Sequence, residues 1–295
     1  MKKHLFYSVA FAVVLAAVLS ACKKDKGDQT IAVTGVTLNQ SSAVIAIDST
    51  LTLVATVAPS NATDTTVSWT SSNPAVATVD DGVVTPLADG MTAITVTTQD
   101  GGMTAACIVV VPGLSLTSDT GVVIDGTKWA TRNVDSVGMF AATALDPGMF
   151  YQWNSATGWS ATEPATSSPA GAIWDSAWDG NGATEWESAN DPCPAGWRMP
   201  TNDELTALAS AGSVGIPALS GRIFGSGANV VFLPAAGARV YSSGALDVVG
   251  GYGYYWSATS DGTANGFYLA LSGFTVNPGS SDLRAYGFSV RCVAE

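Results

Sequence analysis

The 295-residue chain has little of the chemistry on which most enzymes rely. Its one histidine, His4, lies in an N-terminal segment that we expect to be removed. A mature chain without imidazole excludes Ser-His and Cys-His catalysis and histidine-ligated metals. Charged residues make up 12% of the chain, and 24 acids against 12 bases give a formal charge of −12. Because such a chain repels phosphate backbones, we also exclude nucleic acid as a partner.

Long apolar runs are scarce as well. The run from Leu5 to Leu19 is shorter than the roughly 20 residues that a membrane-spanning helix needs. Lys2 and Lys3 precede it and small residues follow it, which is the pattern of a secretory signal. We therefore expect residues 1–21 to be a removed signal peptide, and the alternative is an uncleaved membrane anchor.

The end of this signal, Leu19-Ser20-Ala21-Cys22, resembles the lipobox of bacterial lipoproteins. The resemblance implies cleavage before Cys22 and lipidation of its thiol, with several acyl chains giving a stable anchor. Residues 22–30 are polar and read as a lipidated, flexible tether. We expect the protein to be lipid-anchored in the outer membrane, at the cell surface. The periplasmic face is the alternative, because the charges of the tether are mixed.

Residues 31–111 alternate between apolar and polar side chains, with threonine and valine dominating. This period of two indicates half-buried strands. Asp-Gly pairs, at Asp81, Asp89 and Asp100, recur between the runs and favour hairpin turns. Short strands at this spacing predict an all-β Ig-like sandwich, with Trp69 plugging its core and Cys107 a buried free thiol.

The same stretch resembles the bacterial Ig-like domain, group 2. The residues that carry the resemblance are 36–38 (VTL), 67–73 (VSWTSSN), 76–79 (VATV), 81–85 (DGVVT) and Gly90 before 94–96 (ITV). Such domains typically serve as stalks or modules of cell-surface proteins, which implies a spacer here.

Composition changes at Pro112-Gly113, and residues 112–295 are rich in tryptophan, glycine and loops. One helix is predicted after Pro200, because Thr201 and Glu204 form a capping box ahead of Leu205 and Leu208. Strands are expected at 229–234, 254–259, 265–271 and 287–293. Cys193 and Cys292 are expected to form a disulfide on a secreted route, and the alternative is two buried free thiols.

This region resembles the Fibrobacter succinogenes major paralogous domain. The matching residues are 129–134 (WATRNV), 150–153 (FYQW), 190–201 (NDPCPAGWRMPT), 232–237 (FLPAAG), 255–259 (YWSAT) and 289–293 (SVRCV). The family is related to the C-type-lectin-like fold, and its members are mostly surface or secreted proteins without an assigned activity. The resemblance therefore implies a mixed α/β, loop-rich C-type-lectin-like domain over residues 112–295.

Four tryptophans lie in a stretch rich in serine, glycine, asparagine and acids, and they are candidates for stacking on a sugar: Trp159, Trp174, Trp178 and Trp186. The alternative is that these rings fill the core. Calcium-dependent sugar binding is not expected, because Glu163-Pro164-Ala165 and Trp256-Ser257-Ala258 lack the polar ligands of the calcium-dependent lectins.

No cofactor is expected. An acidic stretch leaves calcium as a weak candidate at Asp175, Asp179, Asn181 and Glu185, although their spacing is not that of an EF-hand. A carboxylate pair such as Asp175 with Glu187 is the candidate site for glycoside hydrolysis.

Together these features predict a multi-domain, non-enzymatic, lipid-anchored envelope protein. Its Ig-like spacer presents a lectin-like head for adhesion to a glycan or a surface protein, without calcium. A structural subunit of a surface assembly is the first alternative, and a carboxylate-dependent glycan-active enzyme is the second.

Overall fold

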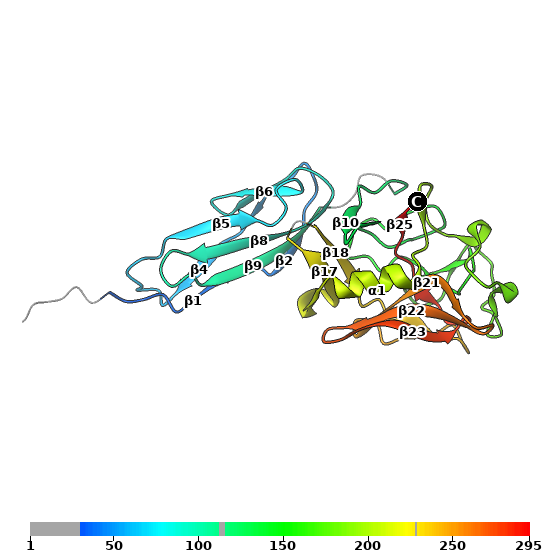
Figure 1. Cartoon of the computed structure of the whole chain (residues 1–295). Helices are drawn as coiled ribbons and strands as arrows, with labels where there is room; N and C mark the ends of the chain where they lie inside the picture. Colours follow the sequence, from blue (N-terminus) through cyan, green and yellow to red (C-terminus); the bar gives the residue numbers. More distant parts are fainter. Residues whose placement is uncertain (1–29, 112–115, 228) are drawn as a thin grey trace, which may run out of the picture.

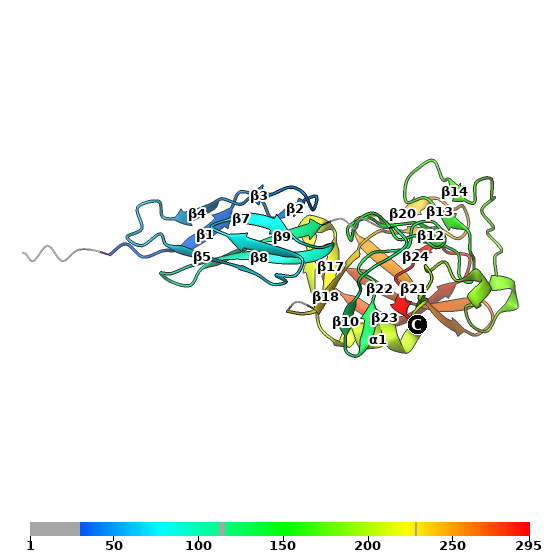
Figure 2. The ribbon, with the colours of Figure 1, turned by 90° about the horizontal axis from the view of Figure 1, so that it is seen from above.

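The protein is described by a computed structural model that covers residues 30–111, 116–227 and 229–295. Cys22 and the predicted signal lie outside the described residues. The molecule is elongated, with strands β1–β9 at one end and the other elements at the opposite end (Figures 1 and 2). Nowhere in the covered ranges is there a helix with the length and apolar character needed to cross a membrane.

The first nine strands form a sandwich of short sheets. Their bounds are β1 (Gly35–Leu38), β2 (Ser42–Val44), β3 (Leu51–Thr52), β4 (Ala55–Ala58), β5 (Val67–Ser71), β6 (Ala77–Asp80), β7 (Val83–Pro86), β8 (Gly90–Thr98) and β9 (Thr104–Val111). The sheet orders are β2-β9-β8-β5, β3-β7-β6 and β1-β4. Trp69 is half-buried against the core between them, and Cys107 is buried and free. Burial raises the pKa of Cys107 to about 11, so its thiol stays protonated at neutral pH.

The C-terminal region, residues 116–295, is mostly β-structure around one nine-residue helix, α1 (Asn202–Ser210). The strands of its largest sheet are β12 (Phe150–Tyr151), β13 (Gly158–Trp159), β14 (Ser167–Ser168), β21 (Tyr252–Asp261), β22 (Asn265–Ser272), β23 (Val276–Leu283) and β24 (Phe288–Ser289). Their order is β14-β13-β12-β24-β21-β22-β23. The expected mixed α/β region is therefore predominantly β-sheet.

Three smaller sheets complete the region. They comprise β10 (Val122–Ile124), β11 (Thr127–Trp129), β25 (Val293–Ala294) and β15 (Trp197–Arg198); β16 (Ser213–Ile216), β17 (Gly221–Ser226) and β18 (Asn229–Pro234); and β19 (Ala238–Arg239) with β20 (Leu246–Asp247). The strand expected at 287–293 is wrong as a single element. It is broken into β24 and β25, and between them the Val290 and Cys292 carbonyls accept hydrogen bonds from the Val134 and Ala130 amides.

Helix α1 begins with the predicted capping box. The Thr201 hydroxyl accepts a hydrogen bond from the Glu204 amide at 3.2 Å, and the Glu204 carboxylate accepts one from the Thr201 amide at 2.8 Å. Leu205 and Leu208 are buried and pack with Leu269 of β22. The helix thereby covers one face of β21–β23 and leaves the other face to different partners (Figure 1).

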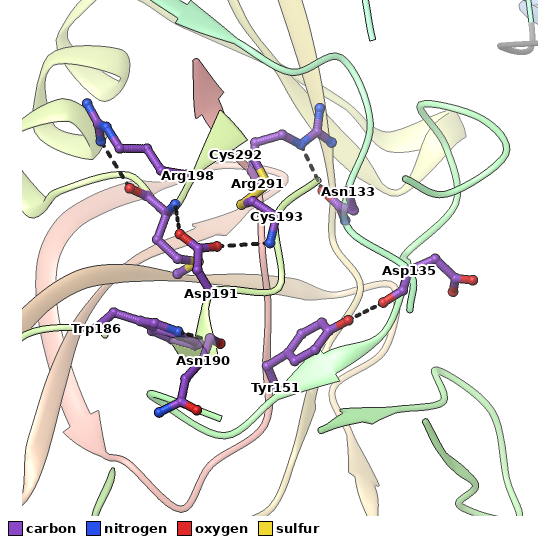
Figure 3. The surroundings of a disulfide bond; sticks show 11 residues. Asn133, Asp135, Tyr151, Trp186, Asn190, Asp191, Cys193, Arg198, Arg291 and Cys292 are labelled. Carbon is purple, nitrogen blue, oxygen red and sulfur yellow. Dashed lines mark hydrogen bonds between the residues drawn. A yellow bond between two sulfur atoms is a disulfide. The ribbon is translucent and has the colours of Figure 1, made fainter. Parts of the chain in front are cut away.

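The two ends of the C-terminal region are joined. Trp129 of β11 pairs with Val293 of β25, which also pairs with β15. The expected disulfide between Cys193 and Cys292 is present beside this sheet, with an S–S distance of 2.07 Å (Figure 3). The Asp191 carboxylate accepts hydrogen bonds from the amides of Cys193 and Met199, which fixes the loop that carries the disulfide.

Buried arginines hold the loops of this region. They are Arg132, Arg222, Arg239, Arg284 and Arg291. Arg291 donates to the Ala130 and Phe232 carbonyls, each at 3.0 Å, and to Asn133 at 2.9 Å. The guanidinium thereby ties Phe232 of β18 to Ala130 and Asn133, which follow β11.

An apolar contact joins the sandwich to the C-terminal region. Met91 and Val110 from β8 and β9 are buried with Ala144 and Phe232. A pocket of about 220 Å³ lies at this junction and is lined from both sides. The two parts therefore share a small apolar core.

Candidate ligand-binding face

The four candidate tryptophans do not form one open platform. Trp159 and Trp186 have 5% and 7% of their surface exposed and lie in the core. Trp174 and Trp178 are half-buried, and each indole N–H donates to a backbone carbonyl at 2.7 Å. Trp159 and Trp186 are therefore core residues. Trp174 and Trp178 attach their loops to the rest of the region through their indole N–H groups.

The candidate calcium residues are not gathered into a site. Asp175 and Asp179 each accept a hydrogen bond from the amide two residues later, and Asn181 has a left-handed backbone with φ 57°. Glu185 forms an isolated bridge with Thr259. Across the ranges covered, no three acidic, histidine or cysteine side chains form a group that could hold a metal ion.

The candidate hydrolytic carboxylates each accept a local hydrogen bond. Asp175 accepts from the Ala177 amide at 2.9 Å, whereas Glu187 accepts from the Asn190 side chain at 3.1 Å. Each carboxylate therefore stabilises its own turn.

The open feature of the C-terminal region is a row of tyrosines on the sheet face opposite α1. Side chains alternate along a strand, so Tyr252, Tyr254 and Trp256 of β21 share one face, and Tyr255 points to the α1 side. Trp256 is opposite Tyr268 of β22, which places that ring on the same face. Trp256 is buried, and the tyrosines beside it keep contact with solvent.

Phe288 of β24 supports this row from within the core. Its ring is 5.0 Å from that of Tyr254, at 21° between planes, and 5.5 Å from that of Tyr286, at 27°. Tyr252 continues the stack, 6.2 Å from Tyr254 at 13°. Tyr241 meets Tyr286 edge-on at 5.1 Å. We call the surface formed by Tyr241, Tyr252, Tyr254, Tyr268 and Tyr286 the tyrosine face.

This stacking decides what the tyrosine face presents. Parallel rings cover one another's flat sides, so the interior of the row offers ring edges and hydroxyl groups. The hydroxyls of Tyr241, Tyr252, Tyr254 and Tyr286 make no hydrogen bond to another residue in the covered ranges. A tyrosine hydroxyl both donates and accepts hydrogen bonds, so the row can form hydrogen bonds with a partner rich in hydroxyl groups.

Acidic side chains adjoin the row. Burial first, and then neighbouring tyrosines and Asp247, raise the pKa of Tyr254. Burial and Asp282 raise the pKa of Tyr268 and of Tyr286. The hydroxyls of Tyr254, Tyr268 and Tyr286 therefore remain protonated well above neutral pH.

No exposed lysine or arginine side chain of the covered ranges belongs to this surface, and the arginine beside its pocket, Arg222, is buried and donates to the Ser272 and Gly273 carbonyls. Lys128 and Arg198 are the basic side chains of the covered ranges that are not buried, and both lie on the sheet formed by β10, β11, β25 and β15. Arg198 is paired with Glu204 at 2.7 Å. The tyrosine face is therefore a neutral to acidic surface.

A pocket of about 330 Å³ opens at the Tyr252 end of the row. Its apolar wall includes Pro217, Ala235 and Phe274, and Gly250 and Gly251 also line it. Phe274, at the β22–β23 turn, is 93% exposed, and Tyr252 is 47% exposed. Tyr252 therefore both lines the pocket and lies next to Tyr254 in the row.

Sequence reasoning missed the tyrosine face because it looked for tryptophans in a polar stretch. The signal was present in the strand expected at 254–259, where tyrosine and tryptophan share one face. Tyr241 and Tyr286 come from loops, and no sequence period could have placed them beside this strand. Trp174 is the predicted ring that borders the face, because its N–H donates to the Tyr241 carbonyl.

Comparison with known proteins identifies the N-terminal part. Residues 32–109 match the bacterial Ig-like domain (group 2) and form a domain of that family. An Ig-like virion protein of Serratia phage KSP90 is 51% identical over 83 residues, which are 28% of this chain and 32% of the relative. Two uncharacterised proteins of Clostridium acetobutylicum are 42% identical over 80 residues and 37% identical over 93 residues. These matches cover 26% and 31% of this chain, and 20% and 10% of the relatives. The chain thus matches about a third or less of each relative.

Proposed function

We propose that this chain is a non-enzymatic binding protein of the cell envelope. In this proposal Cys22 carries the lipid anchor in the outer membrane, and the Ig-like domain is a spacer. Residues 112–295 are the head, a C-type-lectin-like domain that binds a glycan or a surface protein without calcium. The joined ends of the C-terminal region support the lectin-like assignment.

One observation carries the binding role: in the described residues, the hydroxyls of Tyr241, Tyr252, Tyr254 and Tyr286 have no partner within the protein, and they lie beside a largely apolar pocket. Exposed aromatic groups next to polar ones are typical of recognition surfaces. The acidic residues proposed for catalysis or metal binding are instead engaged in local turns. The tyrosine face is therefore suited to binding a ligand.

The test uses labelled protein lacking the first 22 residues, added to intact bacterial cells. We expect saturable binding that chelating calcium does not change and that a Tyr252→Ala/Tyr254→Ala double variant weakens at least tenfold. Ile173→Ala is the control, because Ile173 is 90% exposed and lies outside the tyrosine face. Equal binding by the double variant would contradict a binding role for this face.

Anchoring is tested separately. Mass spectrometry of the mature N-terminus should find acylated Cys22, and protease added to intact cells should shorten the protein. An unmodified N-terminus with His4 still present would contradict the anchor.

A further inference from the structure

The geometry points to an uncharged glycan as the ligand of the tyrosine face, with one sugar ring seated in the pocket between Tyr252 and Phe274. This inference rests on the proposed binding role and names the ligand class of the same site. It follows from three features of the surface: an open ring at the end of a stack, a row of unpartnered hydroxyls, and a lack of exposed positive charge.

The pocket supplies the stacking surface. Tyr252 is 47% exposed and lines the pocket, and Phe274 and Pro217 extend the apolar wall. Its volume of about 330 Å³ lies within the usual range for small-molecule sites, about 300–1,000 Å³. A sugar ring has an apolar C–H face, which such aromatic walls can cover.

The pocket is not wholly apolar. Ser220 lines it, and the hydroxyl of Ser220 makes no hydrogen bond to another residue in the covered ranges. Gly250 and Gly251 carry no side chain, so the ligand can approach the backbone there. A ring with an apolar face and hydroxyl groups around its edge matches this combination of walls and polar atoms.

The row supplies contacts beyond the pocket. From Tyr252 the open hydroxyls continue through Tyr254 toward Tyr286, and Asn277 and Asp282 lie on the same sheet face because they pair with Ala270 and Gly266 of β22. Each of these groups can exchange hydrogen bonds with sugar hydroxyls. A chain of several sugars therefore gains contacts that a single sugar in the pocket does not have.

Charge selects the class of glycan. Asp247 and Asp282 adjoin the row, and the arginine beside the pocket, Arg222, is buried and already donates to Ser213, Ser272 and Gly273. A carboxylated or sulfated glycan would bring like charge to these aspartates without a cation to pair with. Neutral chains avoid that repulsion, so the surface discriminates against anionic polysaccharides.

The test is native affinity electrophoresis of the chain lacking its first 22 residues. The gels contain neutral polysaccharides with vicinal diols (dextran, mannan, xylan) or anionic ones (alginate, polygalacturonate). We expect retardation by at least one neutral polysaccharide, no retardation by the anionic ones, and no effect of a calcium chelator. Retardation by the anionic polymers alone, loss of retardation with the chelator, or no retardation in any gel would overturn the inference.

Variants locate the site. Tyr252→Ala and Phe274→Ala should each weaken the affinity for the retarding polysaccharide about tenfold. Tyr252→Phe keeps the ring and should lose less affinity. Ile173→Ala matches Phe274→Ala in exposure and should bind like the original protein. All variants should keep the same thermal unfolding midpoint. Unchanged retardation with Phe274→Ala would place the glycan elsewhere and overturn the inference.

A parallel experiment separates this inference from the proposed function. Periodate cleaves the vicinal diols of glycans, and protease removes surface proteins. We expect periodate treatment of the target cells to abolish binding and protease treatment to leave it. Binding that survives periodate and is lost with protease would keep the binding role and overturn the glycan ligand. Absence of binding to untreated cells would overturn the proposed function itself.

Discussion

Removing the disulfide should destabilise the C-terminal region and leave the Ig-like domain unchanged. Cys193 and Cys292 are 99 residues apart, and Cys107 of the Ig-like domain is not linked to them. Closing a loop of about 100 residues lowers the entropy of the unfolded chain by the equivalent of about 4.7 kcal/mol in the chain-entropy model. We therefore predict a loss of about 4 to 5 kcal/mol for the Cys193→Ala/Cys292→Ala double variant.

Urea unfolding of the chain lacking its first 22 residues provides the assay. With a denaturant slope of about 2 kcal/mol per molar, the transition of the C-terminal region should fall by roughly 2 M. Buried tryptophans such as Trp153 and Trp256 report that transition by fluorescence, because Trp69 is the only tryptophan of the Ig-like domain. Reduction of the original protein should reproduce the shift. A shift below about 0.5 M would refute the view that this bond closes the fold.

Three further predictions concern the packing. Met91→Ala should destabilise the protein by about 2 kcal/mol, measured by calorimetry, because Met91 is buried at the junction of the two parts. Thr201→Ala should cost about 1 kcal/mol in urea unfolding and Thr201→Ser much less, since serine keeps the cap. Burial raises the pKa of Tyr255 to about 12 and that of Tyr151 further, so the native state keeps protons that the unfolded state releases. The stability should therefore fall above pH 10, by about 1.4 kcal/mol per pH unit for Tyr255 up to its native pKa, and Tyr255→Phe should remove that part. A flat profile in the original protein would contradict the burial of these hydroxyls.

The local parts of the structure could be predicted from the sequence. The capping box of Thr201 and Glu204, the alternating strands of the Ig-like domain and the strand at 229–234 each depend on neighbouring residues. Such short-range patterns carry their own physical signal. The disulfide could be predicted as one of two outcomes, because Cys193 and Cys292 were the remaining cysteines of a region expected to be secreted.

The site could not be predicted, because long-range packing assembles it. Trp159 and Trp186 look like ligand platforms in a polar stretch, yet the fold turns both into the core. Tyr241 and Tyr286 come from separate loops and meet only in the folded chain. Long-range contacts also surround the break between β24 and β25, where Arg291 donates to carbonyls that are distant in sequence.

The central claim is that the tyrosine face recognises the ligand. The most direct test follows the NMR signals of the aromatic rings while the protein is titrated with short oligosaccharides. These are cut from the neutral polysaccharide that retards the protein in affinity electrophoresis. The account predicts the largest shifts for Tyr252 and Phe274, smaller ones for Tyr254, and none for the buried ring of Tyr151. Shifts confined to Trp174 and Trp178, with the tyrosine signals unmoved, would contradict it.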